Sequence, residues 1–90
     1  MENVSAGDVV LSTAGRDKGK TLLVVSVQDK TVTVVDGKTR KTINPKKKNI
    51  RHIKLLQSGS LSGLADRIRS GEPVSDKNVR KGLRFVKENF

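Results

Sequence analysis

The sequence predicts a mainly β protein: a small antiparallel barrel of about five strands, followed by two short α-helices. Three observations support this prediction. Aliphatic and β-branched residues alternate with the period of a pleated strand in segments 22–28 and 31–35. Asp29-Lys30 and Asp36-Gly37, which follow these segments, are typical of tight turns. After residues 57–60, apolar residues recur at helical spacing instead.

The strand region is expected to span residues 1–56, with a loose polar end at 1–6. Segment 22–28 is apolar on both faces, which indicates burial or a neighbouring element on each side. Asp36-Gly37 favours a type I′ hairpin into a polar edge strand, because both positions tolerate positive φ. Apolar residues do not keep one alternation in the last strand, so a bulge or a change of face is expected there. The expected strands are 8–12, 22–28, 31–35, 38–43 and 50–56.

Residues 57–90 are expected to form a linker and two helices. The first helix follows Ser60 or Ser62 as N-cap and stops at Gly71. The second begins at Ser75 or Asp76 and runs to about Glu88. Each expected helix carries a stripe of apolar residues. Such stripes favour packing of the helices against the barrel or against each other, rather than the formation of a groove that binds a partner helix. The stripe residues are Leu61, Leu64, Ala65 and Ile68 in the first helix, and Val79, Leu83 and Val86 in the second, with Phe90 as a further candidate.

The chain carries a strong positive charge. Its 90 residues include 19 Lys and Arg against nine Asp and Glu, a formal net charge of +10. This balance favours a polyanion as partner. The sequence has no apolar run of about 18 residues, and it does not begin with the basic and apolar segments of a secretory signal. We therefore expect a cytoplasmic protein with no membrane partner.

Catalysis and metal binding find little support. The chain has no cysteine, which excludes disulfides, zinc ribbons and thiol catalysis. His52 is the sole histidine, and we interpret it as an ordinary strand or rim residue, with a contact to RNA as the alternative. No nucleophile–base pair or metal cluster stands out. We therefore expect no enzyme activity, no catalytic residue, no metal and no cofactor.

A basic loop lies between the first two expected strands. Gly15 and Gly19 flank Arg16, Lys18 and Lys20. Glycine tolerates positive φ and lets its backbone come close to a bulky anion such as a phosphate. A solvated connection that only keeps the protein soluble is the alternative.

Family resemblance begins at this loop. Residues 7–11 (GDVVL), 14–20 (AGRDKGK) and 24–25 (VV) resemble the KOW motif, a nucleic-acid-binding element of ribosomal proteins and transcription elongation factors. Residues 36–40 (DGKTR) and 44–52 (NPKKKNIRH) resemble the small KOW protein of the archaeal and eukaryotic large ribosomal subunit and its stand-alone bacterial relatives. The resemblance covers about residues 5–56 and does not extend into 57–90.

The resemblance implies an SH3-like barrel that binds structured ribosomal RNA on a ribosomal particle, as a monomer when free. Arg16 and Arg40 are expected to contribute more to RNA binding than the neighbouring lysines, since Arg can bind a phosphate through two parallel hydrogen bonds. The basic positions of the helices, Arg80 and Arg84 among them, are treated as accessory. The alternative is a transcription-associated KOW module that binds RNA polymerase or another protein through an exposed apolar patch. The expected RNA-binding residues are Gly15, Arg16, Lys18, Gly19, Lys20, Lys38, Arg40, Lys41, Lys46, Lys47, Lys48, Arg51 and Lys54.

Overall fold

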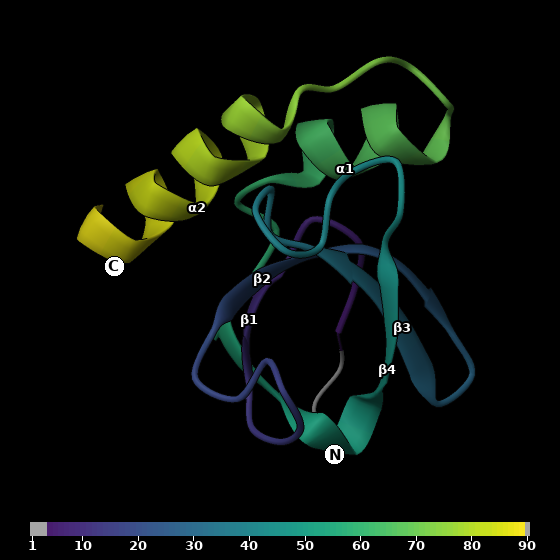
Figure 1. Ribbon diagram of the computed structural model, residues 1–90, viewed down its shortest axis with the longest axis vertical. Helices are drawn as coiled ribbons and strands as arrows, with labels where there is room; N and C mark the ends of the chain where they lie inside the picture. The colour runs from purple at the N-terminus through teal and green to yellow at the C-terminus, as the bar shows by residue number, and fades with distance from the viewer. Residues whose placement is uncertain (1–3, 90) are drawn as a thin grey trace.

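The computed structural model describes residues 4–89 and has a five-stranded antiparallel sheet, curled into a small barrel, with two helices after it (Figure 1). The strands lie in the order β4-β3-β2-β1-β5. The predicted fold class is therefore confirmed. The elements are β1 Val9–Ser12, β2 Thr21–Gln28, β3 Thr31–Val35, β4 Lys46–Asn49, the 3-10 helix η1 Ile50–His52, β5 Ile53–Gln57, α1 Ser62–Arg69 and α2 Asp76–Asn89.

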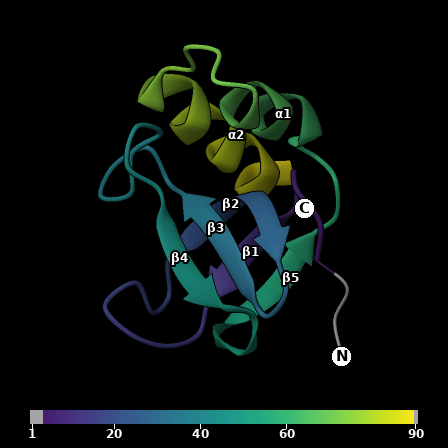
Figure 2. The same ribbon diagram turned by 90° about the vertical axis from the view of Figure 1, so that its right-hand side faces the viewer.

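Strand β2 lies in the middle of the sheet, and its successive side chains enter two different hydrophobic clusters. Both helices lie on one side of the barrel (Figures 1 and 2). The helix-facing cluster comprises Val9, Leu23, Val25, Val35, Val74, Val79, Leu83 and Val86. The inner cluster comprises Val4, Val10, Leu22, Val24, Val32, Val34 and Ile53. The pleat of β2 sends alternate residues to opposite faces, so the predicted burial on both faces is confirmed.

Two irregularities interrupt the ladders. Between β1 and β5, Val9 pairs with Gln57 and Val10 with Leu55, which leaves Leu56 as the extra residue of a bulge. The bulge that the sequence predicts in the last strand is therefore present. A second register shift, between Val24 and Ser26, interrupts the β2–β3 pairing.

The expected edge strand at 38–43 is wrong. The Asp36 carboxylate accepts hydrogen bonds from the backbone N–H groups of Lys38 and Arg40, both at 2.8 Å, and so folds this segment into a loop. The edge strand is instead β4, formed by the lysine run itself, whose Lys48 pairs with Val32 of β3. The following 50–56 segment is a strand only from Ile53, because its first three residues form η1.

The N-terminal segment also differs from the prediction. Val4 belongs to the inner cluster, and the Ser5 N–H donates to Asp8 Oδ2 at 2.8 Å, so residues 4–6 are not a loose end. The remaining part of that prediction, residues 1–3, lies outside the described residues. The link after β5 is tied to the same region, because the Gly59 N–H donates to Asp8 Oδ1 at 2.7 Å.

The helices follow their predicted bounds closely. Leu61 is the N-cap of α1 and makes no side-chain capping bond, so the predicted serine cap is wrong. The predicted stop is confirmed at Gly71, which follows the helix with φ +83°. Helix α2 begins at Asp76, where the Ser75 hydroxyl accepts a hydrogen bond from the Asn78 N–H at 3.1 Å. The predicted burial of Val79, Leu83 and Val86 is confirmed, whereas Phe90 lies outside the described residues.

Candidate nucleic-acid interface

The basic loop that joins β1 to β2 is closed by its own backbone hydrogen bonds. The Gly19 N–H donates to the Ser12 carbonyl at 2.8 Å, and the Ser12 N–H donates to the Lys20 carbonyl at 2.9 Å. Gly15 and Gly19 have φ of +78° and +88°, a conformation that side chains with a Cβ rarely adopt. Arg16 and Lys18 lie exposed between these two glycines. The loop therefore presents two cations on a defined backbone.

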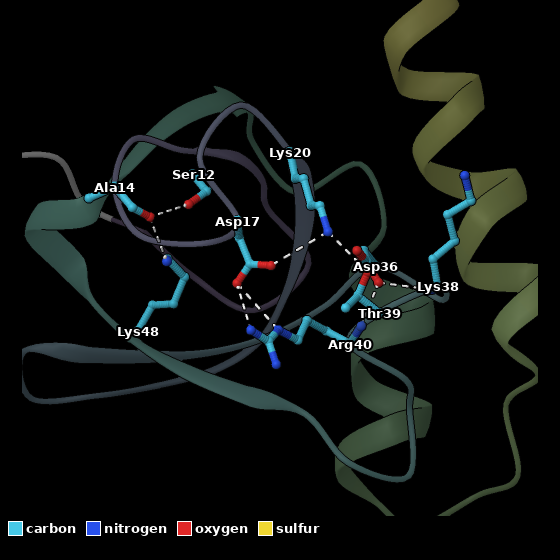
Figure 3. A network of polar contacts seen from close by, with 9 residues as sticks. All are labelled: Ser12, Ala14, Asp17, Lys20, Asp36, Lys38, Thr39, Arg40 and Lys48. Atoms are coloured by element: carbon cyan, nitrogen blue, oxygen red, sulfur yellow. Dashed lines mark hydrogen bonds and ion pairs between the residues drawn. The ribbon is translucent and has the colours of Figure 1, made fainter.

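A buried carboxylate joins this loop to the loop after β3. The Asp17 side chain is only 2% exposed, and its Oδ2 lies 3.3 Å from Arg40 Nε and 3.2 Å from Arg40 Nη2 (Figure 3). Lys20 Nζ lies 3.8 Å from Asp17 Oδ1, so this second contact is an ion pair and not a hydrogen bond. Arg40, which we expected to grip phosphate, uses its guanidinium on Asp17.

Further bonds hold the same two loops together. Lys20 Nζ donates to Thr39 Oγ1 at 3.0 Å, while Asp36 organises the backbone on either side of Thr39 (Figure 3). Lys38 projects from this frame, and within residues 4–89 its ammonium group takes part in no hydrogen bond or ion pair. The loops at 13–20 and 36–45 therefore form one frame from which the remaining cations project.

Lys48 has a structural role. Lys48 is only 9% exposed, and its ammonium group donates a hydrogen bond to the Ala14 carbonyl at 3.1 Å (Figure 3). Because Lys48 pairs with Val32, its side chain leaves β4 on the face of the inner cluster. Its aliphatic stem covers the cluster while its charge supports the basic loop. The neighbouring Lys46 and Lys47 are exposed.

The structure thus sorts the thirteen expected RNA-binding residues. Arg40 and Lys48 are bound to protein groups, and Lys20 is half-exposed with two protein contacts. Arg51 lies in η1, which adjoins the first loop because the Thr13 N–H donates to the His52 carbonyl at 2.9 Å. Lys54 lies on β5, at the other end of the strand order from β4. The exposed cations are Arg16, Lys18, Lys38, Lys41, Lys46, Lys47, Arg51 and Lys54.

Sequence reasoning treated Arg80 and Arg84 of α2 as accessory and did not name Lys87. Lys20 and Lys38 line one side of a groove of about 410 Å³, and three basic residues of α2 line the other. These are Arg80, Arg84 and Lys87. Their spacing of four and three residues was a signal, because it places them on one side of a helix.

Other kinds of site find no further support among the residues described. No group of three or more His, Asp or Glu side chains within residues 4–89 is arranged to hold a metal ion. His52 is exposed on η1. In the part of the chain that the structure describes, no helix combines the length and the apolar character needed to cross a membrane.

A scan against protein-family models finds no model that matches this chain, and a search of curated proteins finds no match either.

Proposed function

We propose that this protein is a non-catalytic RNA-binding protein of the KOW type, which associates with the ribosome and holds structured ribosomal RNA. The observation that carries the proposal is the frame around Asp17 and Asp36, because it fixes two basic loops against each other and leaves their other cations exposed. The sequence resemblance of about residues 5–56 to KOW proteins supports the ribosomal partner. A cytoplasmic location is part of the same proposal.

Phosphate contacts fall to the cations that are not used by the protein itself. Arg16 replaces Arg40 as the arginine expected to contribute most, since Arg40 is held by Asp17. Lys18 lies beside it in the loop, and Lys46 and Lys47 extend the surface along β4. Each phosphate neutralised by such a cation releases counterions, which supplies a favourable free energy that salt reduces.

Folded RNA is the preferred ligand in this proposal because the strand region has no aromatic residue. The chain contains no Trp or Tyr, and its two phenylalanines are Phe85 and Phe90. Proteins that bind single strands stack bases on aromatic rings, each worth about 1 to 3 kcal/mol. Without that platform, affinity rests on phosphate contacts and on the shape of the RNA.

Salt titration tests the proposal. For roughly five phosphate contacts, the logarithm of the binding constant should fall with the logarithm of salt concentration at a slope of about −3.5 to −4.5. The measurement compares large-subunit ribosomal RNA with an unstructured RNA of equal length. Tighter binding to the unstructured strand, or a slope near zero, would contradict the proposal.

Charge reversal in the first loop provides a second test. Arg16→Glu with Lys18→Glu should weaken RNA binding strongly, because both side chains project from the loop into solvent. Thermal unfolding should change little, since surface substitutions usually alter stability by no more than about 0.5 kcal/mol. Unchanged affinity in a folded variant would show that this loop is not the site.

A transcription-associated module that binds RNA polymerase or another protein is the second candidate. It is favoured by Ile43, which is 90% exposed and lines a hollow of about 490 Å³ together with Ile68, Pro73 and Val74. Sedimentation separates the two candidates. The RNA-binding protein should move with ribosomal particles at low salt and leave them at high salt, whereas Ile43→Ser should not affect this association.

A further inference from the structure

We propose that α2 is a second RNA-contacting element, and that the groove between α2 and the loop at 36–40 receives the phosphate backbone of the bound RNA. This inference rests on the proposed RNA-binding function and extends it to a helix outside the region of KOW resemblance. The groove is lined by Lys20 and Lys38 on the barrel side and by Arg80, Arg84 and Lys87 on the helix side.

The charges of the groove suit a polyanion of extended shape. Arg80, Arg84 and Lys87 span about 10 Å along the helix axis, given a rise of 1.5 Å per residue. Within the described residues, Asp36 is the one acidic side chain that lines the groove, and it is 9% exposed with Oδ1 bound to two backbone N–H groups. One wall of the groove carries a row of three cations and the other wall carries two. This arrangement suits a channel that contacts successive phosphates of a nucleic-acid backbone.

The walls of this groove are fixed to each other. Gly37 has φ +77°, and a Cβ at this position would overlap the Asp76 carbonyl oxygen, so the loop and the start of α2 touch at the backbone. Arg80 Nη1 donates to the Gly37 carbonyl. Thr42 donates to Asp76 Oδ1 through its N–H at 2.9 Å and to the Val74 carbonyl through its hydroxyl at 3.0 Å. Such preorganisation lowers the entropy lost when a ligand binds.

Three of the groove cations are available to a ligand. Lys38, Arg84 and Lys87 are exposed, and within residues 4–89 none of their side chains takes part in a hydrogen bond or an ion pair. In Figure 3 the Lys38 side chain extends alongside α2. Lys20 also belongs to the frame that carries Arg16 and Lys18, so an RNA strand bound at the loop continues into the groove.

A matched pair of double variants tests this inference in the full-length protein. Arg84→Gln with Lys87→Gln removes two charges from the groove, while Lys77→Gln with Lys81→Gln removes two exposed charges of the same helix that do not line it. Glutamine has nearly the same helix propensity as the residues it replaces. Filter binding to large-subunit ribosomal RNA across salt concentrations gives the affinity and the salt slope, and thermal unfolding verifies the fold.

The groove variant should bind about tenfold more weakly or worse, and its salt slope should become shallower by about 1.4 to 1.8, the share of two phosphates. The control variant should change both quantities far less. Lys38→Gln, on the opposite wall, should shift the slope by about half as much as the groove variant without touching the helix.

Equal losses in the groove and control variants would reduce the effect to net charge and overturn the inference. An unchanged affinity of the groove variant would do the same. In either case, weakened binding by Arg16→Glu with Lys18→Glu would leave the proposed function standing. Failure of the unmodified protein to bind the RNA would remove both proposals together.

Discussion

Asp17 belongs to the first basic loop, and its almost fully buried carboxylate joins that loop to the loop after β3 through Arg40. A buried carboxylate needs compensating charge and hydrogen bonds, and Arg40 supplies both from a position distant in the sequence. Asp17 thus engages the guanidinium of Arg40, whereas Arg16 in the same loop stays exposed. Asp36 acts in the same way on the backbone of its own loop.

Loss of the Asp17 charge should therefore weaken the fold. We expect Asp17→Asn to lower the free energy of unfolding by about 1 to 3 kcal/mol, because charge-assisted hydrogen bonds to Arg40 are lost. Asp29→Asn, at an exposed turn, is the matched control and should stay within about 0.5 kcal/mol. Chemical denaturation measures both values, and equal stability of the two variants would contradict a structural role for Asp17.

At the scale of elements, the contact between the 36–45 loop and α2 depends on a glycine. Gly37 combines positive φ with direct backbone contact to the helix, whereas Gly19 has positive φ with open space around it. The two positions separate the cost of the left-handed conformation from the cost of the close approach.

Alanine at these positions should therefore have unequal effects. Gly19→Ala should cost about 1 to 2 kcal/mol, the penalty for a Cβ in the left-handed conformation. Gly37→Ala should cost clearly more, because the added methyl group also forces α2 away from the loop. Thermal or denaturant unfolding provides the comparison. Equal losses of unfolding free energy in the two variants would mean that the loop and α2 can move apart at little cost, which would contradict a tight contact at Gly37.

The elements with a hydrophobic period are the ones that sequence reasoning could find. The first three strands and both helices follow from alternating or helical apolar patterns and from turn residues. Strand β4 could not be found in this way, because Lys46 and Lys47 carry no apolar signal and the strand forms by pairing with β3. Residues 38–43 had the alternation of a strand, but the backbone N–H groups of Lys38 and Arg40 donate hydrogen bonds to the Asp36 side chain, which folds the segment into a loop.

The candidate site was only partly predictable for a related reason. Residue type and glycine spacing identified the basic loop and the exposed Arg16 and Lys18. The commitment of Arg40 to Asp17 and of Lys48 to Ala14 depends on tertiary contacts across many residues, which no local pattern records. The basic groove residues of α2 were not assigned to the site, because the apolar stripe of the helix already gave a sufficient reason for the helix to form.

At the scale of the whole molecule, the helices complete the core. Val9, Leu23, Val25 and Val35 of the strands pack with Val74, Val79, Leu83 and Val86. Burying one such side chain contributes about 1.5 to 3 kcal/mol, and a domain of this size is stable by only about 5 to 15 kcal/mol in total. The free energy lost by exposing the helix-facing cluster to water is therefore comparable with the total free energy of unfolding.

A chain that ends at Gln57 should consequently fail to fold by itself. Circular dichroism should show no cooperative thermal transition for residues 1–57, whereas the full chain should show one. Replacing exposed Arg67 and Arg69 by Gln in the full chain is a control that leaves the packing intact. A cooperative, β-rich transition in the shortened chain would show that the inner cluster alone supports the barrel.

The strand order also determines when the barrel closes during folding. Neighbours β1 to β4 pair in chain order, down to Gln28 with Thr31 in the β2–β3 hairpin, but β5 must return to β1, where Gln57 meets Val9. Long-range closure loses more chain entropy and is slower than hairpin formation. We expect hydrogen-exchange labelling during refolding to find the β5 amides protected later than those of the other four strands. On a translating ribosome, the barrel then stays open at least until residue 57 has left the exit tunnel, and it becomes stable only when the helices have also emerged and docked.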